Sequence, residues 1–208
     1  MDPGDGGGGD PDPDPDPDPE PTEPEGAVWV TVPRPPSAIT CQLTPDITID
    51  DTNVTRDLYL RLNMPDDVRG VDFGVAAEGG LVFNGPTALQ PAGNTMSSQF
   101  AIDLFPCIEF DSYFDLGEAE NLLFIAQPPS TDWGPVARAA YVVSGGAPNE
   151  AVQRPDLFPD STSYYIRVAR VTTPLETEVS GRFEAVLEEF GTGLSLQISV
   201  EIPPVGGL

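Results

Sequence analysis

The chain has 208 residues and a formal net charge of −25 at pH 7, and it contains no His. All nine of its basic residues are Arg, so Ser-His-Asp catalysis, His-bound zinc, Schiff-base chemistry and Lys-dependent phosphate loops are excluded. The negative charge disfavours nucleic acids and anionic membrane surfaces as partners, and the Arg residues are spread along the sequence from Arg34 to Arg182 without a local cluster.

Residues 1–25 form the first predicted unit, a disordered acidic linker. They contain ten of the 34 acidic residues, and residues 10–19 read Asp-Pro five times. Proline favours extended polyproline II, in which carboxylates on one face of the Asp-Pro run recur only about every 19 Å. Such a rod cannot wrap one calcium ion, so this segment is predicted to be a spacer. Residues 26–208 are long enough to form a folded domain with its own core.

Alternation of apolar and polar residues dominates residues 26–208 and predicts short antiparallel strands. Gly-rich and Pro-containing turn signals separate these runs. The pattern predicts an all-β antiparallel sandwich. The alternating apolar positions are Leu58, Leu60 and Leu62, then Val71, Phe73 and Val75, then Ile108, Phe110 and Phe114, and finally Leu194, Leu196, Ile198, Val200 and Ile202.

Residues 181–190 fit two patterns. Phe183, Val186, Leu187 and Phe190 have helical spacing, whereas Phe183, Ala185 and Leu187 alternate. We favour a strand that pairs, through the Gly191-Thr192-Gly193 turn, with the terminal strand; a helix is the alternative.

Cys41 and Cys107 are the two cysteines of the chain. Their spacing fits no metal motif, so they are either a disulfide pair or two buried thiols. The linker and the β pattern favour an extracellular or cell-surface protein and therefore the disulfide. No segment reads as a signal peptide or as a membrane-spanning stretch, so an export signal would have to lie upstream.

Acidic residues near turns are candidate calcium ligands, but none matches the EF-hand loop. Solvated acidic edges are the expected alternative, and we predict no cofactor. The candidates are Asp46, Asp50, Asp51, Asp66, Asp67, Asp111 and Asp115.

Four aromatic residues are candidate ligand-binding positions, because exposed coplanar rings stack on sugars. Trp133 lies in a Pro-rich stretch that predicts a loop, and Tyr113, Tyr141 and Tyr165 occupy positions that an outward strand face would present. The alternative for Trp133 is a plug at one end of the sandwich.

Glu109 and Asp111 are the pair that a glycoside-active enzyme would use. On one strand face their carboxyl groups would lie about 7 Å apart. Any acidic β protein contains such pairs, so the sequence predicts no enzyme.

The run from Leu58 to Phe83 resembles the early strands of cohesin-like modules, in which a strand, a short turn and a Gly-apolar-x-Phe strand precede a Leu-x-Phe strand. The segment from Phe105 to Tyr113 is similar to a stretch in uncharacterised secreted bacterial sandwiches. These resemblances imply a jelly-roll-like module that serves in surface assembly, although the chain is longer than a cohesin, with large insertions around residues 127–159.

Together these features predict a non-enzymatic interaction or adhesion module that meets a protein or glycan outside the cell. A carbohydrate-binding module is the second hypothesis, and a glycoside-active enzyme is the third.

Overall fold

The computed structural model describes residues 25–43, 45–73, 81–84, 99–117, 122–126, 136–137, 139–143, 149–188 and 192–206. Residues 1–24 of the predicted linker, Trp133 and part of the predicted insertions around residues 127–159 (127–135, 138 and 144–148) lie outside this part of the chain.

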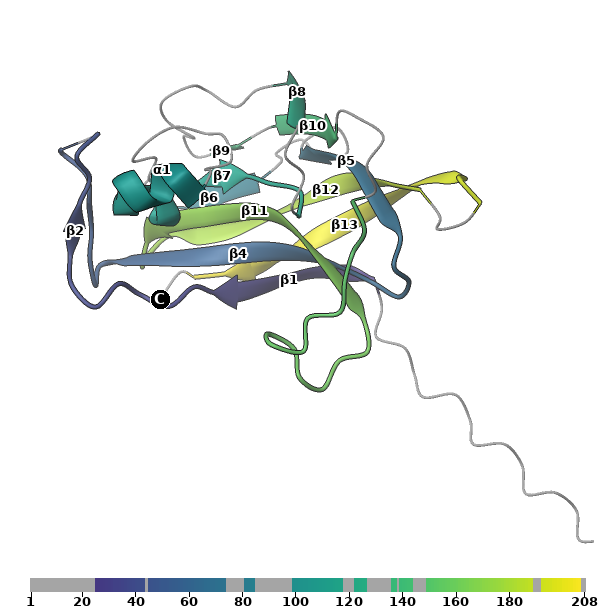
Figure 1. Ribbon diagram of the computed structural model, residues 1–208, viewed down its shortest axis with the longest axis horizontal. Helices are drawn as coiled ribbons and strands as arrows, with labels where there is room; N and C mark the ends of the chain where they lie inside the picture. The colour runs from purple at the N-terminus through teal and green to yellow at the C-terminus, as the bar shows by residue number, and fades with distance from the viewer. Residues whose placement is uncertain are drawn as a thin grey trace, which may run out of the picture.

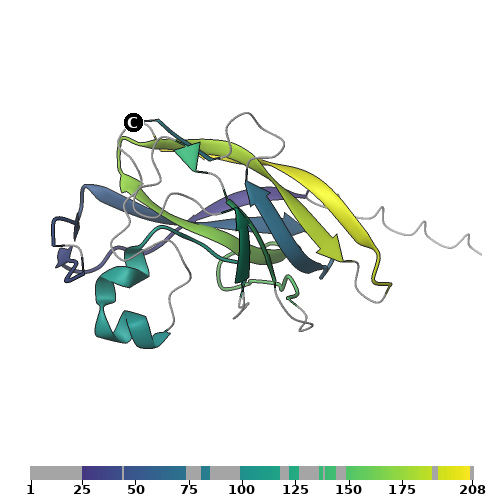
Figure 2. The ribbon, with the colours of Figure 1, turned by 90° about the horizontal axis from the view of Figure 1, so that it is seen from above.

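Two antiparallel sheets face each other, which confirms the predicted all-β sandwich. Figure 2 shows them as two layers, with β12 and β13 in one and β4 and β11 in the other. In the described ranges the four-stranded sheet has the order β1 (Gly26–Thr31), β4 (Asn53–Leu62), β11 (Tyr164–Pro174) and β7 (Tyr113–Phe114). The seven-stranded sheet contains β8 (Leu122–Ala126), β10 (Ala139–Val143), β5 (Asp67–Phe73), β12 (Glu178–Glu188), β6 (Leu81–Asn84), β9 (Val136–Ala137) and β13 (Ser195–Val205).

The core lies between the sheets and follows the alternation of the sequence. Leu58, Leu60 and Leu62 of β4 are fully buried, and Phe183 and Leu187 of β12 belong to the same apolar cluster. The intervening residues of β4 therefore point to the outer face of the four-stranded sheet.

Residues 178–188 form the strand β12, so the prediction for this ambiguous segment is confirmed over its described part. β12 pairs with β13 along almost its whole length, for example through Leu187 and Leu196.

The apolar face of β13 is only partly buried. Val200 and Ile202 lie in the core, but Leu194 is 66 % exposed and Leu196 is 58 % exposed. Trp29 of β1 donates to the carbonyl of Pro203 (2.9 Å) near the other end of β13. Figures 1 and 2 show the opposite end of β13 extending beyond β1 and β4, so no described strand of the four-stranded sheet covers the leucines there.

The strand predicted from Ile108 to Phe114 is present only at its end, as β7 (Tyr113–Phe114). A short helix, α1 (Gln99–Leu104), is followed by a 3-10 helix, η1 (Pro106–Phe110), with Pro106 in its first turn. A proline fits the first turn of a helix because no N–H is needed there. Glu109 is exposed whereas Asp111 is buried, so these carboxylates do not share a strand face and the predicted catalytic geometry is wrong.

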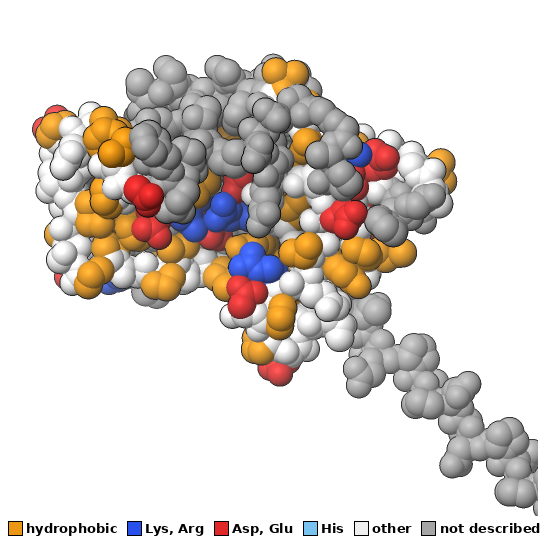
Figure 3. Space-filling view, viewed as in Figure 1, with side chains coloured by type: hydrophobic (Ala, Val, Ile, Leu, Met, Phe, Trp, Pro, Cys, Tyr) orange, Lys and Arg blue, Asp and Glu red, His pale blue; other side chains and the backbone are white. Residues whose placement is uncertain are grey.

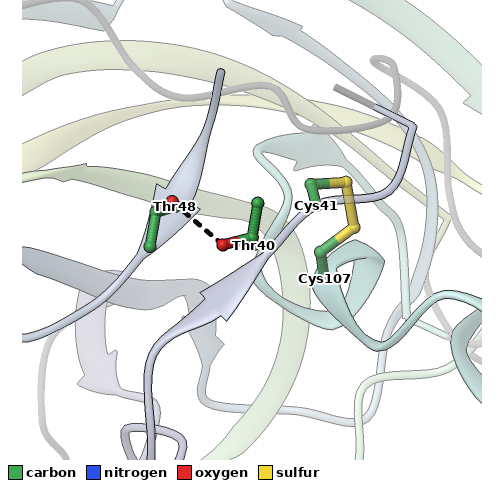
Figure 4. The surroundings of a disulfide bond; sticks show 4 residues. All are labelled: Thr40, Cys41, Thr48 and Cys107. Atoms are coloured by element: carbon green, nitrogen blue, oxygen red, sulfur yellow. Dashed lines mark hydrogen bonds between the residues drawn. A yellow bond between two sulfur atoms is a disulfide. The ribbon is translucent and has the colours of Figure 1, made fainter. Parts of the chain in front are cut away.

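Cys41 and Cys107 form the predicted disulfide, with 5.2 Å between their Cα atoms. The bond connects η1 to the small hairpin of β2 (Ile39–Thr40) and β3 (Thr48–Ile49), across which the Thr40 and Thr48 hydroxyls share a hydrogen bond of 3.3 Å (Figure 4). Both cysteines pack with Ile108 in a second, smaller apolar cluster. Within the described residues, no helix has the length and apolarity to cross a membrane.

Candidate functional site

A groove of about 580 Å³ lies on the outer face of the four-stranded sheet. Its floor comes from β4 and β11, one wall from the end of β1 and the following coil (residues 30–33), and the other from residues 149–163, which we call the arm. Figure 3 shows Arg side chains gathered near the middle of this face, with acidic side chains around them. A concave site of this size, with both polar and apolar walls, is typical of a ligand pocket.

A β-bulge brings two Arg residues of the floor together. Arg167 lies opposite Tyr59, and Arg170 lies opposite Asp57, although their spacing of three residues would place them on opposite faces of a regular strand. The register shift between Arg167 and Ala169 inserts the extra residue Val168, so both guanidinium groups reach the outer face.

Arg170 and Asp57 form a two-pronged ion pair at the bottom of the groove. Nε and Nη2 of Arg170 donate to the two carboxylate oxygens of Asp57 at 2.6 and 2.7 Å, and Nη1 donates to the Glu109 carbonyl of η1 at 2.7 Å. All three nitrogens of this buried guanidinium therefore donate hydrogen bonds within the protein, and Arg170 stabilises the floor of the groove.

Arg167 is less completely engaged. Its Nε donates to Oδ2 of Asp115 at 2.7 Å and its Nη2 also contacts that oxygen, whereas its Nη1 lies 3.5 Å from Oδ2 of Asp57. Among the described residues, that long contact is the one polar partner of Nη1. The tip of Arg167 thus keeps hydrogen-bond donors beside the groove.

Arg154 projects from the arm above Tyr59. Its Nε and Nη2 donate to both carboxylate oxygens of Asp156 at 2.9 and 2.7 Å, and its Nη1 approaches the Tyr59 hydroxyl at 3.5 Å. The Arg154 side chain is 34 % exposed and that of Asp156 is 57 % exposed, so this ion pair is a solvent-screened one at the rim.

The arm is held to the sheet by aromatic contacts. Phe158 stacks on Tyr165, with 4.0 Å between ring centroids, and meets Tyr59 edge-on at 6.0 Å. Val152 and Tyr165 exchange two backbone hydrogen bonds. These contacts fix the distance between the arm and the floor, so the groove is pre-formed.

The carboxylates of this face differ in their protonation behaviour. Burial raises the pKa of Asp115 above its ordinary value of 3.8, although Arg167 and the Leu116 amide counteract it. The hydrogen bonds from Arg154 lower the pKa of Asp156. Burial also raises the pKa of Tyr59, so its hydroxyl is a neutral donor and acceptor at physiological pH.

The predicted aromatic platform is not assembled from the three tyrosines. Tyr113 and Tyr165 lie on the outer face of the four-stranded sheet, but they are only 4 % and 3 % exposed. Tyr165 is covered by Phe158, and Tyr113 lies beneath Arg167 and Arg170 at 5.8 and 5.7 Å. Tyr141 points into the core, where its hydroxyl donates to the Val168 carbonyl at 2.5 Å. Tyr113 and Tyr165 therefore lie on the predicted outward face but are covered, the outward placement of Tyr141 is wrong, and Trp133 lies outside the described residues.

The acidic residues considered as calcium ligands form hydrogen bonds and ion pairs within the protein or lie too far apart to share an ion. Asp50 caps the turn before β4 by accepting from the amide and hydroxyl of Thr52. Asp67 accepts from the Asn149 amide and pairs with Arg69. In the described part of the chain, no group of three or more acidic or Cys side chains comes together as a metal site would require.

The Arg residues of the groove were not predicted from the sequence. The nine Arg are spread along the chain, whereas Arg154, Arg167 and Arg170 line one groove. The bulge shows in the sequence only as two consecutive apolar residues between Arg167 and Arg170, and the arm meets β4 only through tertiary contacts. The spacing of Arg167 and Arg170 within one polar-apolar run was the one available signal.

Comparisons with known proteins identify no relative. No protein-family model, no curated protein and no solved structure matches the chain. The resemblance to cohesin-like modules thus gains no support from these comparisons.

Proposed function

We propose that this chain is a non-enzymatic interaction module that is displayed outside the cell on its acidic linker and binds its ligand in the groove. The observation that carries the proposal is the pre-formed groove of about 580 Å³, in which Nη1 of Arg154 and Nη1 of Arg167 make only long contacts of 3.5 Å within the described residues, beside apolar walls. Polar groups that converge in a concave site are the usual mark of a binding site.

The non-catalytic part of the proposal rests on how the floor carboxylates are used. Asp57 is neutralised by Arg170, and Asp115 by Arg167. A general acid or base needs a carboxyl group that can exchange a proton with a bound substrate. The chain also has no His or Lys to take that role.

The extracellular part rests on the disulfide and on the linker. A buried disulfide persists in oxidising compartments. The Asp-Pro run of the sequence favours an extended spacer, which supports display of the domain away from a surface. An interaction or adhesion role of the cohesin-like kind is consistent with such display.

Recognition of a glycan is the second candidate function. The groove supplies hydrogen-bond donors that a sugar hydroxyl could use, but its rings are buried and do not offer stacking faces. The sugar hypothesis therefore depends on Trp133, and loss of polysaccharide binding in Trp133→Ala would support it.

The groove is tested by filling it. Val152 lines the groove and is 52 % exposed, so Val152→Trp would occupy the space without removing a buried contact. We expect binding of the cognate compound, selected from panels of blocked peptides and polysaccharides by biolayer interferometry, to be lost in this variant. Leu123→Trp provides the matched control, because Leu123 of β8 is equally exposed (57 %) on the other sheet.

Two results would contradict the proposal. Binding that survives Val152→Trp would place the ligand elsewhere. Recovery of a chemically altered ligand, detected by mass spectrometry after prolonged incubation with the full chain, would show turnover and end the non-enzymatic assignment.

A further inference from the structure

We propose that the groove binds the side-chain carboxylate of an acidic peptide segment, which Arg154 and Arg167 grip together. This inference rests on the proposed binding function and specifies the chemistry of its ligand. It follows from which donors of the groove are already used and which remain for a ligand.

The two Arg residues offer their Nη1 groups. Each Nη1 carries two N–H donors, yet its nearest polar partner among the described residues lies at the long distance of 3.5 Å, Tyr59 for Arg154 and Asp57 for Arg167. The other nitrogens of both side chains are engaged by Asp156 and Asp115. The donors that remain require an acceptor, and a carboxylate accepts from two guanidinium groups more strongly than a neutral oxygen does.

In the absence of ligand Arg154 forms an ion pair with Asp156, but this ion pair is weak. The two side chains are solvent-exposed and lie two residues apart on the arm, and exposed pairs of this kind contribute little because water screens them. A ligand carboxylate that enters the groove can replace Asp156 on Arg154 at little cost. Asp156 is thus an internal competitor for the ligand.

Glu150 works against an anionic ligand. It lines the groove, and its side chain is exposed. Because its charge is solvated, its repulsion is screened and smaller than the direct contacts with two guanidinium groups. Its removal is therefore expected to strengthen carboxylate binding.

The apolar lining favours a peptide over a glycan. Val30, Val32 and Pro33 form one wall, and Val152 and Leu157 contribute to the other. These side chains match the apolar residues that flank an Asp or Glu in a peptide. A hydroxyl-rich sugar would leave its polar groups unsatisfied against them, and the buried tyrosine rings offer it no stacking face.

The test uses a library of blocked hexapeptides, each with one central Asp and apolar neighbours, and the same library with Asn in its place. Binding to the isotopically labelled full chain is followed by NMR shifts of the arm and β11 amides. We expect the Asp peptides to bind about tenfold or more tightly than the Asn peptides, as for the loss of one charge-assisted contact.

Substitutions of the charged residues are expected to change Asp-peptide affinity in opposite directions. Arg154→Gln should weaken Asp-peptide binding about tenfold, whereas Asp156→Asn should strengthen it about two- to fivefold and Glu150→Gln about twofold. Arg182→Gln makes the same charge change on β12 of the other sheet, at a residue that does not line the groove, and should leave affinity within about twofold. Unchanged thermal unfolding of Arg154→Gln confirms that the loss is not one of folding.

The outcomes separate this inference from the proposed function. Equal binding of Asp and Asn peptides, absence of binding by both libraries, or charge variants without effect would overturn the carboxylate assignment. Binding of polygalacturonate with the same variant pattern, and of no acidic peptide, would overturn it in favour of an anionic glycan. In each of these cases a ligand lost on Val152→Trp would leave the groove as the binding site, whereas Asp-peptide binding insensitive to Val152→Trp would refute the groove itself.

Discussion

The two faces of the four-stranded sheet are both covered by protein, but different chemistry covers each. On the inner face, Leu58 and Leu60 pack against the apolar residues of the other sheet. On the outer face, Asp57, Arg167 and Arg170 form ion pairs beneath η1 and the arm. The polar half of an alternating strand pattern is normally assigned to solvent. In this protein it marks a second buried layer, and the groove lies where that layer is incomplete.

The difference matters for stability because the two layers fail in different ways. An apolar contact that is lost leaves a cavity, whose cost grows with its volume. A buried ion pair that loses one partner leaves an uncompensated charge, which is more costly than the intact pair is stabilising. The predictions that follow separate these two modes.

Asp57→Ala is expected to have the largest effect, a loss of about 3–5 kcal/mol in the free energy of unfolding. The substitution removes the carboxylate partner of the buried Arg170 guanidinium, whose Nε and Nη2 both donate to Asp57. Replacing both partners, as Asp57→Leu with Arg170→Met, should restore most of the loss because no charge is then left buried. Leu60→Ala on the inner face should cost about 2–5 kcal/mol.

Urea unfolding under non-reducing conditions measures these changes. If Asp57→Ala costs less than about 1 kcal/mol, the outer layer is solvated like an ordinary surface pair, and the comparison between the two faces fails.

Removal of the disulfide, as Cys41→Ala with Cys107→Ala, should lower the free energy of unfolding by about 2–4 kcal/mol, because a bond across a sequence separation of 66 residues restricts the unfolded chain. It should also increase the mobility of η1, whose Glu109 carbonyl accepts a hydrogen bond from Arg170. Hydrogen exchange should therefore rise at η1 more than at β12 of the core. Uniform acceleration at both places would mean that the disulfide supports the whole fold and does not specifically secure the outer cover.

The pH dependence of stability distinguishes the buried carboxylate of the outer layer, Asp115, from the exposed carboxylate at its rim, Asp156. Burial raises the folded-state pKa of Asp115 above 3.8, so its ionisation opposes folding, and this contribution destabilises the protein as the pH rises through and above 3.8. Asp156 has a lowered pKa, so its contribution is present above 3.8 and is lost as the pH falls below that value.

Carboxyl carbon NMR titration checks both directions. Asp115 should titrate above 3.8 and Asp156 below it. Asp115→Asn should remove the first transition and leave the second unchanged. The reverse order of the two titrations would mean that Arg167 outweighs burial at Asp115.

Much of the fold was predictable from the sequence, whereas the site was not. Alternation predicted the sandwich and β12 because the burial of each strand residue depends on local period-two geometry. The disulfide followed from the compartment argument. The groove depends on a bulge at Val168, which shows only in the spacing of Arg167 and Arg170, and on an arm that meets β4 from far along the chain and leaves no local pattern. The same limit explains η1, where Pro106 and the second apolar cluster override an alternating run.

The smallest effect on the free energy of unfolding is expected at the start of β13, where the apolar residues alternate as predicted but are exposed. Leu196 and Val200 lie on the same face of β13, yet only Val200 is buried. Leu196→Thr should change the free energy of unfolding by no more than about 0.5 kcal/mol, whereas Val200→Thr should cost about 1–3 kcal/mol because it buries a hydroxyl. Equal losses at the two positions would mean that Leu196 is covered in solution. A dependence of the Leu196→Thr effect on protein concentration would then assign that cover to a second copy of the chain, since stability gained by association follows mass action.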